Sequence, residues 1–425
     1  MIDRNMIFSI QYRFLQTLFL SLFFLSSSSS SSTADSSNSL PKWTAPHGDP
    51  SKPLGGWKTV PGASFVNIYN ATTEIGTYNH AAMITFGSEI SDPKPLFTLS
   101  WKNSPKDEDS PGQRILYSQS FDGQDWTATN TGSNILFPNM STSSNPAALF
   151  AGPFIWLNDH LYASASPTQF CLFPDQYQDV LLLRRVFTNM TDVFGPIFWA
   201  TYPPPSLFKE ASLINGILNL TEVDTTTKDD IALLIPTQQQ PCIKNSSKCE
   251  ACAFGCQDWK KAGNVGNERT HYTIPGSPNG QNSNQDVLLY RTKSNILSAS
   301  IRTEPNIDAW SSPSQTTNIP NDNSNINTGA LPDGRRYLLS NAMPYVIRDP
   351  LTIATSTDGI DWNTCAVVMT CTNLSGDSCG PQFPGKYKNP GPSYPQGVVA
   401  FDSLFVVATN NKENVWVARL PLESL

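Results

Sequence analysis

Two stretches decide the fold: RILYSQSFDGQDW, residues Arg114–Trp126, and LTIATSTDGIDW, residues Leu351–Trp362. Each contains a β-forming run, then Ser-x-Asp-Gly, then a Trp three residues after the Gly. The Asp can accept backbone N–H groups across a turn, and the Gly can adopt the positive φ that such a turn requires. The Trp can pack back between strands and bury a large apolar area. We therefore assign both turns a structural role at the corners of β-sheets.

A degenerate third copy, ILSASIRTEPNIDAW, spans Ile296–Trp310, and its Trp lies 52 residues before Trp362. That separation suits one blade of a propeller. Other short apolar runs bounded by turn residues also predict strands, among them AAMITF, PLFTLSW, DVLLLRRVF, IALLIP, DVLLYR and GVVAFDSLFVVATN. The sequence therefore predicts an all-β fold, a six- or seven-bladed β-propeller.

The charge balance limits the partners. The formal net charge is −7 and only 15% of the residues are charged. Without a basic surplus to neutralise phosphates, nucleic acid and anionic lipid are not expected partners. A local arginine site for an acidic ligand remains compatible with this balance. The composition predicts no oligomeric state.

The first residues have the pattern of a secretory signal. An apolar run of twelve residues, Phe14–Leu25, follows two arginines and precedes a serine run. The run falls short of the ~20 residues that span a bilayer, although a membrane anchor is the alternative interpretation. We expect a signal peptide over residues 1–33, a flexible leader over 34–56 and a single propeller domain over 57–425. After removal of the signal, no membrane association is expected.

The cysteines and the glycosylation sequons agree with export. All eight cysteines lie beyond the expected signal, and an oxidising compartment favours disulfides. The spacing of Cys249 and Cys252 would also suit zinc, but local disulfides are the preferred interpretation, and no metal or cofactor is predicted. Asn-x-Ser/Thr sequons occur at Asn70, Asn139, Asn189, Asn219, Asn245 and Asn373. We expect a secreted, glycosylated protein.

The two turns resemble the Asp box, Ser-x-Asp-x-Gly-x-Thr-Trp, of the sialidase (neuraminidase) superfamily, although each is one residue shorter. GALPDGRRYLLSN, residues Gly329–Asn341, resembles another segment of that superfamily. The resemblance implies a sialidase-like BNR-repeat β-propeller that acts on a glycan at its centre. Two segments depart from it: Tyr78–His80 stands where sialidases have Arg-Ile-Pro, and Thr409–Lys412 reads TNNK, without the third arginine of the carboxylate-binding triad.

Eight residues are candidates for the site. His80 can serve as a general acid or base, because the ordinary pKa of histidine lies near 6.5, but a core histidine is the competing interpretation. The resemblance implies Tyr394 as a nucleophile and Arg291 as a carboxylate ligand. The predicted catalytic residues are His80, Tyr394 and Glu108, and the predicted substrate-binding residues are Arg114, Arg291, Asn79, His160 and Asn341.

Glu108 and His160 also have structural interpretations. Glu108 lies beside another acidic residue and near Arg114, where it could form an acid/base pair or a solvated loop. His160 follows Asn158 and Asp159 in a predicted turn, where a structural role is favoured.

The leading hypothesis is a carbohydrate-active enzyme that acts on an acidic glycan, such as one containing uronate. One route is β-elimination, in which Arg114 or Arg291 neutralises the carboxylate and His80 or a tyrosine removes the acidified proton. The other route is hydrolysis with Tyr394 as nucleophile. The alternatives are a non-catalytic glycan-binding or cell-wall interaction propeller and recruitment of the same site to small-molecule chemistry.

Overall fold

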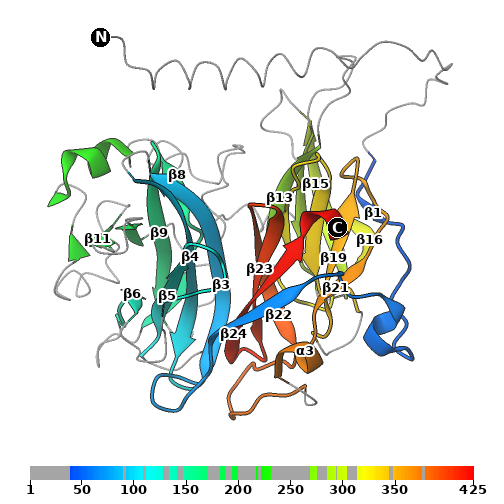
Figure 1. Ribbon diagram of the computed structural model, residues 1–425, viewed down its shortest axis with the longest axis horizontal. Coiled ribbons are helices and arrows are strands. Elements are labelled where there is room, and N and C mark those ends of the chain that lie inside the picture. Colours follow the sequence, from blue (N-terminus) through cyan, green and yellow to red (C-terminus); the bar gives the residue numbers. More distant parts are fainter. Residues whose placement is uncertain are drawn as a thin grey trace, which may run out of the picture. The chain divides into compact units, whose positions relative to one another are not determined.

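The computed structural model forms one folded unit over Leu40–Leu425 (Figure 1). The residues that it describes are 39–89, 92–108, 112–127, 134–140, 147–169, 182–186, 194–199, 217–218, 222–230, 269–274, 285–292, 294–303, 314–343, 348–375 and 379–425. In these ranges, no helix has both the length and the apolar character required to cross a bilayer.

The described strands form five sheets of four or more strands, here numbered in chain order, and one two-stranded pair. The first sheet contains β3 (Tyr78–Glu89), β4 (Asp92–Ser104), β5 (Arg114–Ser120) and β6 (Ile135–Phe137). The second contains β7 (Ala147–Ala151), β8 (Ile155–Leu157), β9 (His160–Gln169), β10 (Leu182–Val186), β11 (Phe194–Trp199) and β12 (Ile217–Leu218). The third contains β13 (Arg269–Ile274), β14 (Gln285–Tyr290), β15 (Ile296–Thr303) and β16 (Gln315–Pro320).

The last two sheets complete the chain. The fourth contains β17 (Asn327–Ala330), β18 (Arg336–Ser340), β19 (Leu351–Ser356) and β21 (Ala366–Met369), and the fifth contains β22 (Pro392–Ala400), β23 (Ser403–Asn410), β24 (Asn414–Pro421) and β2 (Ser64–Tyr69). The two-stranded pair is β1 (Lys42–Trp43) with β20 (Asp361–Trp362). Short helices are η1 (Pro53–Gly56), α3 (Cys371–Ser375) and η8 (Leu422–Ser424).

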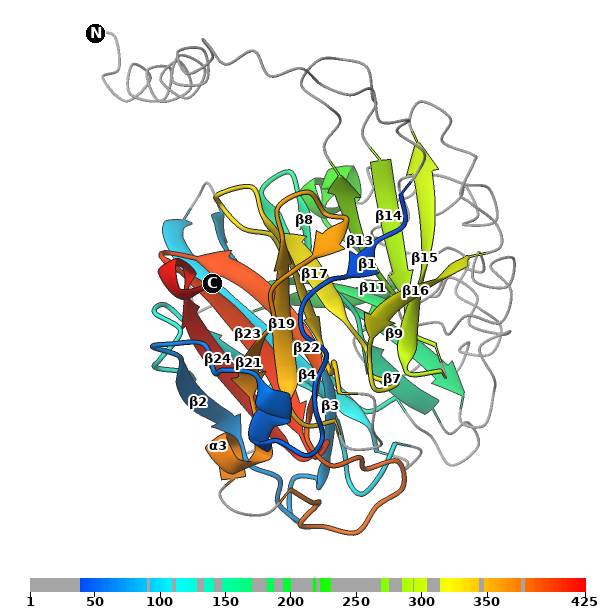
Figure 2. The ribbon, with the colours of Figure 1, turned by 90° about the vertical axis from the view of Figure 1, so that its right-hand side faces the viewer.

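The arrangement of the sheets is that of a β-propeller. The first strands of neighbouring sheets lie against one another, with β3 contacting β7 and β22, and β17 contacting β22 and β13. The fifth sheet takes its outer strand from the other end of the chain, because β2 pairs antiparallel with β24 (Figure 2). The predicted propeller fold is confirmed, whereas six or seven blades stays a prediction.

The first Asp-box turn has the predicted hydrogen bonds. The carboxylate of Asp122 accepts the backbone N–H groups of Gln124 and Asp125, each at 2.8 Å. Ser120 Oγ accepts the N–H of Gly123 at 2.8 Å, and that glycine has a φ of 74°. A Cβ at Gly123 would lie 2.3 Å from Phe405 of the fifth sheet, so this turn is fitted against the neighbouring sheet.

The second turn repeats this geometry at another boundary between sheets. Asp358 accepts the N–H groups of the two residues that precede Trp362, each at 2.8 Å. Tyr272 of β13 donates its hydroxyl to the carbonyl of Gly359 at 2.7 Å and packs edge-on against the fully buried Trp362. Both turns therefore join adjacent sheets, as their assigned structural role requires. The strand of the third copy is also present, as β15, but the turn after it lies outside the described residues.

The expected leader over 34–56 needs correction. Trp43 is only 3% exposed, and β1 pairs in parallel with β20 beside the second Asp-box turn (Figure 2). Trp57, expected to begin the domain, donates its indole N–H to the carbonyl of Pro46 at 3.0 Å. The folded unit thus begins at Leu40. Apolar burial of two tryptophans in a Pro- and Ser-rich stretch outweighs its loop-like composition.

The cysteine prediction is confirmed in part. Cys371 and Cys379 form a disulfide, whereas Cys365 is free and its burial raises the pKa of its thiol to about 12. The remaining predicted disulfide partners lie outside the described residues: Cys171, Cys242, Cys249, Cys252 and Cys256.

Candidate functional site

Charged residues gather at the end of the sheets opposite to the Asp-box turns. In four sheets, the connection between the second and third strands supplies one of them: Glu108, Arg291, Arg348 and Lys412. In the second sheet, where β8 lies off the path of main strands, the corresponding connection runs from β9 to β10 and lies outside the described residues. Because the first strand of each antiparallel sheet begins at the same end, β3 and β22 bring their first residues to this cluster.

His80 and Tyr394 lie at the centre of the cluster. Their ring centroids are 3.9 Å apart, and His80 is 3% exposed. The Nδ1 atom of His80 is buried without a hydrogen-bond partner. Burial, followed by the charges of Lys412 and Arg348, holds the pKa of His80 well below its ordinary value. His80 is therefore a neutral imidazole near pH 7, able to accept a proton.

Two arginines converge on Tyr394. Arg291 donates Nη1–H to the Tyr394 hydroxyl at 2.8 Å and Nε–H to Asn323 Oδ1 at 2.6 Å. Arg348 places its guanidinium carbon 5.3 Å from the centroid of the Tyr394 ring and donates Nη2–H to the carbonyl of Asn323 at 3.0 Å. The Nη1 atom of Arg348 is buried and has no partner. Two guanidinium groups near one tyrosine can hold a carboxylate.

Asp322 lies beside these arginines on the connection from β16 to β17. It is 5% exposed, and its Oδ2 atom is buried without a partner. Burial raises the pKa of Asp322 to about 6, against the opposing effect of Arg348 and Arg291. The carboxyl group can therefore change its protonation state in the mildly acidic range.

A second part of the cluster contains two buried lysines. Lys102 Nζ and Lys412 Nζ lie 3.9 Å and 3.6 Å from the carboxylate of Glu108. Both ammonium groups also lie near the ring of Tyr78, at 5.8 Å and 5.7 Å from its centroid. Although burial alone would raise the pKa of Glu108, the two lysines hold it below its ordinary value. This carboxylate is therefore ionised, and burial and Glu108 raise the pKa of the Tyr78 hydroxyl.

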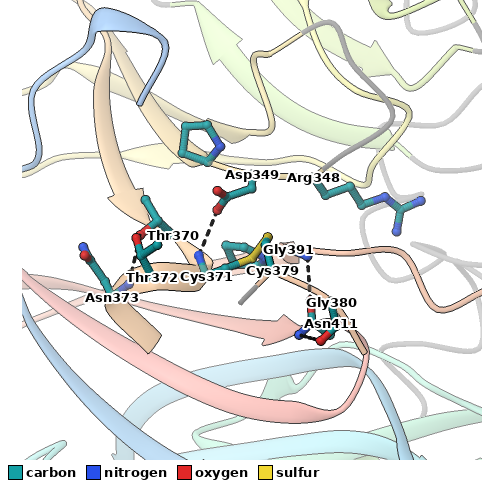
Figure 3. The surroundings of a disulfide bond; sticks show 12 residues. Arg348, Asp349, Thr370, Cys371, Thr372, Asn373, Cys379, Gly380, Gly391 and Asn411 are labelled. Carbon is teal, nitrogen blue, oxygen red and sulfur yellow. Dashed lines mark hydrogen bonds between the residues drawn. A yellow bond between two sulfur atoms is a disulfide. The ribbon is translucent and has the colours of Figure 1, made fainter. Parts of the chain in front are cut away.

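The backbone that follows Arg348 is held by the segment that contains the disulfide (Figure 3). Asp349 accepts the N–H of Cys371 at 2.9 Å, while the Arg348 side chain extends away from the sulfur atoms. Gly391 has a φ of 101°, and a Cβ there would lie 2.2 Å from the Arg348 carbonyl oxygen. Asp349 and the two cysteines also form the one group of possible metal ligands among the described residues. Because both sulfur atoms are joined in the disulfide, this group offers no thiolate pair.

Comparison with known proteins agrees with this architecture. The family model of the BNR repeat-like domain matches residues 201–407. A solved chain described as a sialidase has a TM-score of 0.67 and 20% identity, covering 90% of this chain and 35% of its own. This protein has a sialidase-like β-propeller fold, and its residues 201–407 match the BNR repeat-like domain.

More distant structures have less in common with this propeller. The sialidase of Trypanosoma rangeli has a TM-score of 0.44 and 9% identity, covering 86% of this chain and 60% of its own. An α-L-arabinofuranosidase of Podospora anserina, solved with cellotriose, has a TM-score of 0.35 and 10% identity, covering 83% and 95%. No curated protein matches the sequence. The propeller spans about a third of the length of the first sialidase chain, and at these identities the likeness concerns the fold.

Of the eight predicted residues, four lie in the cluster of this propeller: His80, Tyr394, Arg291 and Glu108. Asn79 and Arg114 lie outside the cluster and bond to the strands and turns next to it. Asn79 donates to the carbonyl of Glu413 at 2.6 Å and accepts from Asn103 at 2.9 Å. Arg114 donates to Asn103 at 3.0 Å and to the carbonyl of Ile75 at 2.9 Å. These bonds position strands, so the structure gives Arg114 a supporting place.

Asn341 and His160 have other partners. Asn341 donates its amide to the carbonyls of Arg348 and Pro392, each at 2.9 Å, and so holds two of the connections that carry the cluster. His160 begins β9, at the Asp-box end of the propeller, where its Nδ1 lies 2.7 Å from a buried carboxylate oxygen of Asp230. The structure does not bring His160 to the cluster.

Several members of the cluster were not among the sequence candidates: Tyr78, Lys102, Asp322, Arg348 and Lys412. A signal existed for the last two. Lys412 ends the TNNK segment, and Arg348 stands beside a predicted strand, where a guanidinium can bind a carboxylate but can equally pair with Asp349. Lys102 pairs directly with His80 across β3 and β4, a register that the sequence alone leaves open.

Proposed function

We propose that this propeller acts on a glycan that contains uronate and cleaves it by β-elimination at the His80–Tyr394 cluster. The observation that carries the proposal is a buried, neutral His80 with an unpaired Nδ1, packed against a tyrosine whose hydroxyl is bonded to Arg291. Buried polar atoms in proteins usually have partners, so an unpaired one in such a cluster suits a bound substrate.

The reaction needs three tasks, and the cluster has a group for each. Arg291 and Arg348 neutralise the uronate carboxylate, which acidifies the proton on C5 of the sugar. His80 Nδ1 removes that proton as the C4–O bond breaks and a C4=C5 double bond forms. The Tyr394 hydroxyl gives its proton to the departing oxygen and is then reprotonated from His80. The products are an unsaturated uronate and a free hydroxyl on the other fragment.

The test uses uronate oligosaccharides and follows the ultraviolet absorbance of the unsaturated product. The wild-type protein is expected to generate this absorbance, and His80→Gln and Tyr394→Phe to lower kcat by about 100-fold or more, since each removes a proton-transfer group. His47→Gln and Tyr117→Phe are matched controls, because neither residue lies in the cluster. Both controls should retain wild-type rates.

Other outcomes identify the alternatives. New reducing ends without absorbance, lost in Tyr394→Phe, would indicate hydrolysis through a tyrosine nucleophile. Binding without turnover would favour a glycan-binding propeller. Neither binding nor turnover with any uronate oligosaccharide would contradict the proposal.

We propose further that the protein works outside the cytosol. The three sequon asparagines that the structure describes, Asn70, Asn139 and Asn373, are all exposed, as glycosylation requires. The Cys371–Cys379 disulfide also suits an oxidising compartment. A shift in gel mobility on treatment of the expressed protein with an N-glycosidase would test this location, and a protein retained in the cytosol without glycans would contradict it.

A further inference from the structure

Two large apolar side chains are exposed among the described residues, at opposite ends of β22. Tyr387 is 62% exposed and Phe401 is 58% exposed, and both have left-handed backbones, with φ of 63° and 53°. Phe401 packs its ring against Phe86 and Phe97, at centroid distances of 5.1 Å and 6.1 Å. The described residues provide no such ring partner for Tyr387. Packing therefore accounts for Phe401 but leaves Tyr387 unexplained.

The segment that carries Tyr387 is held firmly. Lys388 Nζ, on a side chain 1% exposed, donates to Glu413 Oε1 at 2.7 Å, to the carbonyl of Thr77 at 2.8 Å and to that of Phe383 at 3.2 Å. The Glu413 carboxylate also accepts the N–H groups of Gln382 and Phe383, at 2.7 Å and 2.8 Å. The residue next to Tyr387 is thus fixed in three directions, and the ring stands on a rigid base.

That base borders the cluster of the proposed function. Thr77 precedes Tyr78, and Glu413 follows Lys412, so the contacts of Lys388 reach the neighbours of two cluster residues. Gly385 lies close to the carbonyl of Lys106, since a Cβ there would be 2.7 Å from that oxygen. The segment therefore bridges the turns that carry Glu108 and Lys412, at the site end of the sheets.

A left-handed conformation is unfavourable for tyrosine, and glycine or asparagine would relieve it. An exposed ring obtains no compensating burial in the free protein. An exposed aromatic with a polar tip instead suits a ligand that is apolar on one face and hydroxylated at its edge. A sugar ring has this chemistry, because its axial C–H groups form an apolar face and its hydroxyls can meet the phenol.

We propose that Tyr387 is a stacking platform for a sugar unit adjacent to the disaccharide whose bond is cleaved in the cluster. The inference rests on the proposed function and specifies its substrate as an oligosaccharide or polysaccharide chain that extends over residues 379–391. A substrate short enough to fit within the cluster gains nothing from Tyr387, whereas a longer chain gains one bound ring.

The test compares uronate oligosaccharides of increasing length in wild type and Tyr387→Ala. For the longest chains, Tyr387→Ala should raise KM by about tenfold with kcat unchanged, whereas KM for the disaccharide should not change. Tyr387→Phe keeps the stacking face and should raise KM for the longest chains much less than Tyr387→Ala, because it removes only the contact of the phenol hydroxyl. Tyr387→Gly should raise KM like the alanine variant without lowering Tm, because it relieves the left-handed backbone. Phe401→Ala is the matched control and should leave KM unchanged at every length.

Equal KM values for Tyr387→Ala and wild type on long chains would overturn the platform while leaving the proposed reaction intact. A uniform loss of activity at every length would overturn it as well, since that pattern indicates a disturbed cluster. If no chain is cleaved, calorimetric titration with the same series distinguishes the two ideas: tighter binding of longer chains that is lost in Tyr387→Ala supports the platform without the reaction, and length-independent binding overturns it.

Discussion

The two ends of β5 and β19 differ in how completely their polar side chains are hydrogen-bonded. At the ends where Ser120 and Ser356 stand, the Asp-box carboxylates and hydroxyls are bonded to nearby backbone N–H groups. At the other end of the sheets, His80 Nδ1, Arg348 Nη1 and Asp322 Oδ2 are buried without partners. We call the Asp-box end the fastened end, because Asp122, Asp358 and the two serines are bonded locally, and the opposite end the incomplete end, because these three charged or titratable side chains have unpartnered atoms. Proteins usually depart from complete hydrogen bonding where a ligand binds.

The largest expected effect comes from the rigid part of the site end, where Lys388 and Glu413 form an ion pair with both side chains 1% exposed. Glu413→Ala should destabilise the protein by about 3–5 kcal/mol, because it leaves a buried ammonium unpaired. Urea unfolding would measure the change. The double variant Lys388→Met/Glu413→Leu should recover much of the loss, and a double variant as unstable as the single one would contradict this account.

Gly123→Ala should destabilise the protein through its fastened end. The new methyl group meets Phe405 at 2.3 Å in a left-handed backbone, so we expect a loss of about 2–4 kcal/mol from overpacking and strain together. Gly334→Ala is the control, because Gly334 has a φ of 93° with no atom near its absent Cβ. Its loss should be about 1 kcal/mol in the same thermal unfolding experiment. Equal losses would mean that contact between the sheets is unimportant.

Asp322 should make the incomplete end sensitive to pH. Its folded pKa of about 6 lies above the ordinary 3.8, so its contribution to stability is complete below pH 3.8 and is lost as the pH rises through 6. Asp322→Asn should therefore stabilise the protein by about 1–3 kcal/mol at pH 7 relative to its effect at pH 4. Unfolding of both proteins at the two pH values measures this, and a pH-independent difference would exclude the raised pKa.

The smallest effect should come from Asp358→Ala at the fastened end. The carboxylate accepts two backbone N–H groups in an exposed turn, which water can partly replace, so the expected loss is about 1 kcal/mol. Asp125→Ala in the other turn offers a control, because no Asp-box bond uses its side chain. Chemical denaturation should show that only Asp358→Ala shifts the midpoint.

The fastened end was predictable from sequence because its bonds are local. Ser120, Asp122 and Gly123 interact within four residues, so the motif itself contains the geometry. The site end is assembled from turns of four sheets, and its members lie hundreds of residues apart. His80, Tyr394 and Arg291 were found through the resemblance and through residue chemistry, which need no register.

The remaining members of the site depended on information that a single sequence does not contain. Lys102 reaches His80 only through the pairing of β3 with β4, and Arg348 reaches Tyr394 only through the packing of the fourth sheet on the fifth. Arg114 has the right chemistry but is directed by Asn103 and the Ile75 carbonyl to a supporting place. Residue type alone therefore could not tell Lys102 and Arg348, which reach the site, from Arg114, which does not. That distinction depends on strand register and sheet packing, which set the direction of each side chain.

The pairing of β2 with β24 has a consequence for biosynthesis. The fifth sheet gains its outer strand only when the last strand has been made, although β2 leaves the ribosome among the first folded segments. Until then β2 presents an unpaired edge to other chains, and closure requires a contact across almost the whole sequence, which is slow to form. The growing chain therefore exposes this edge until β24 pairs with it, and association with other chains is most favoured in that interval.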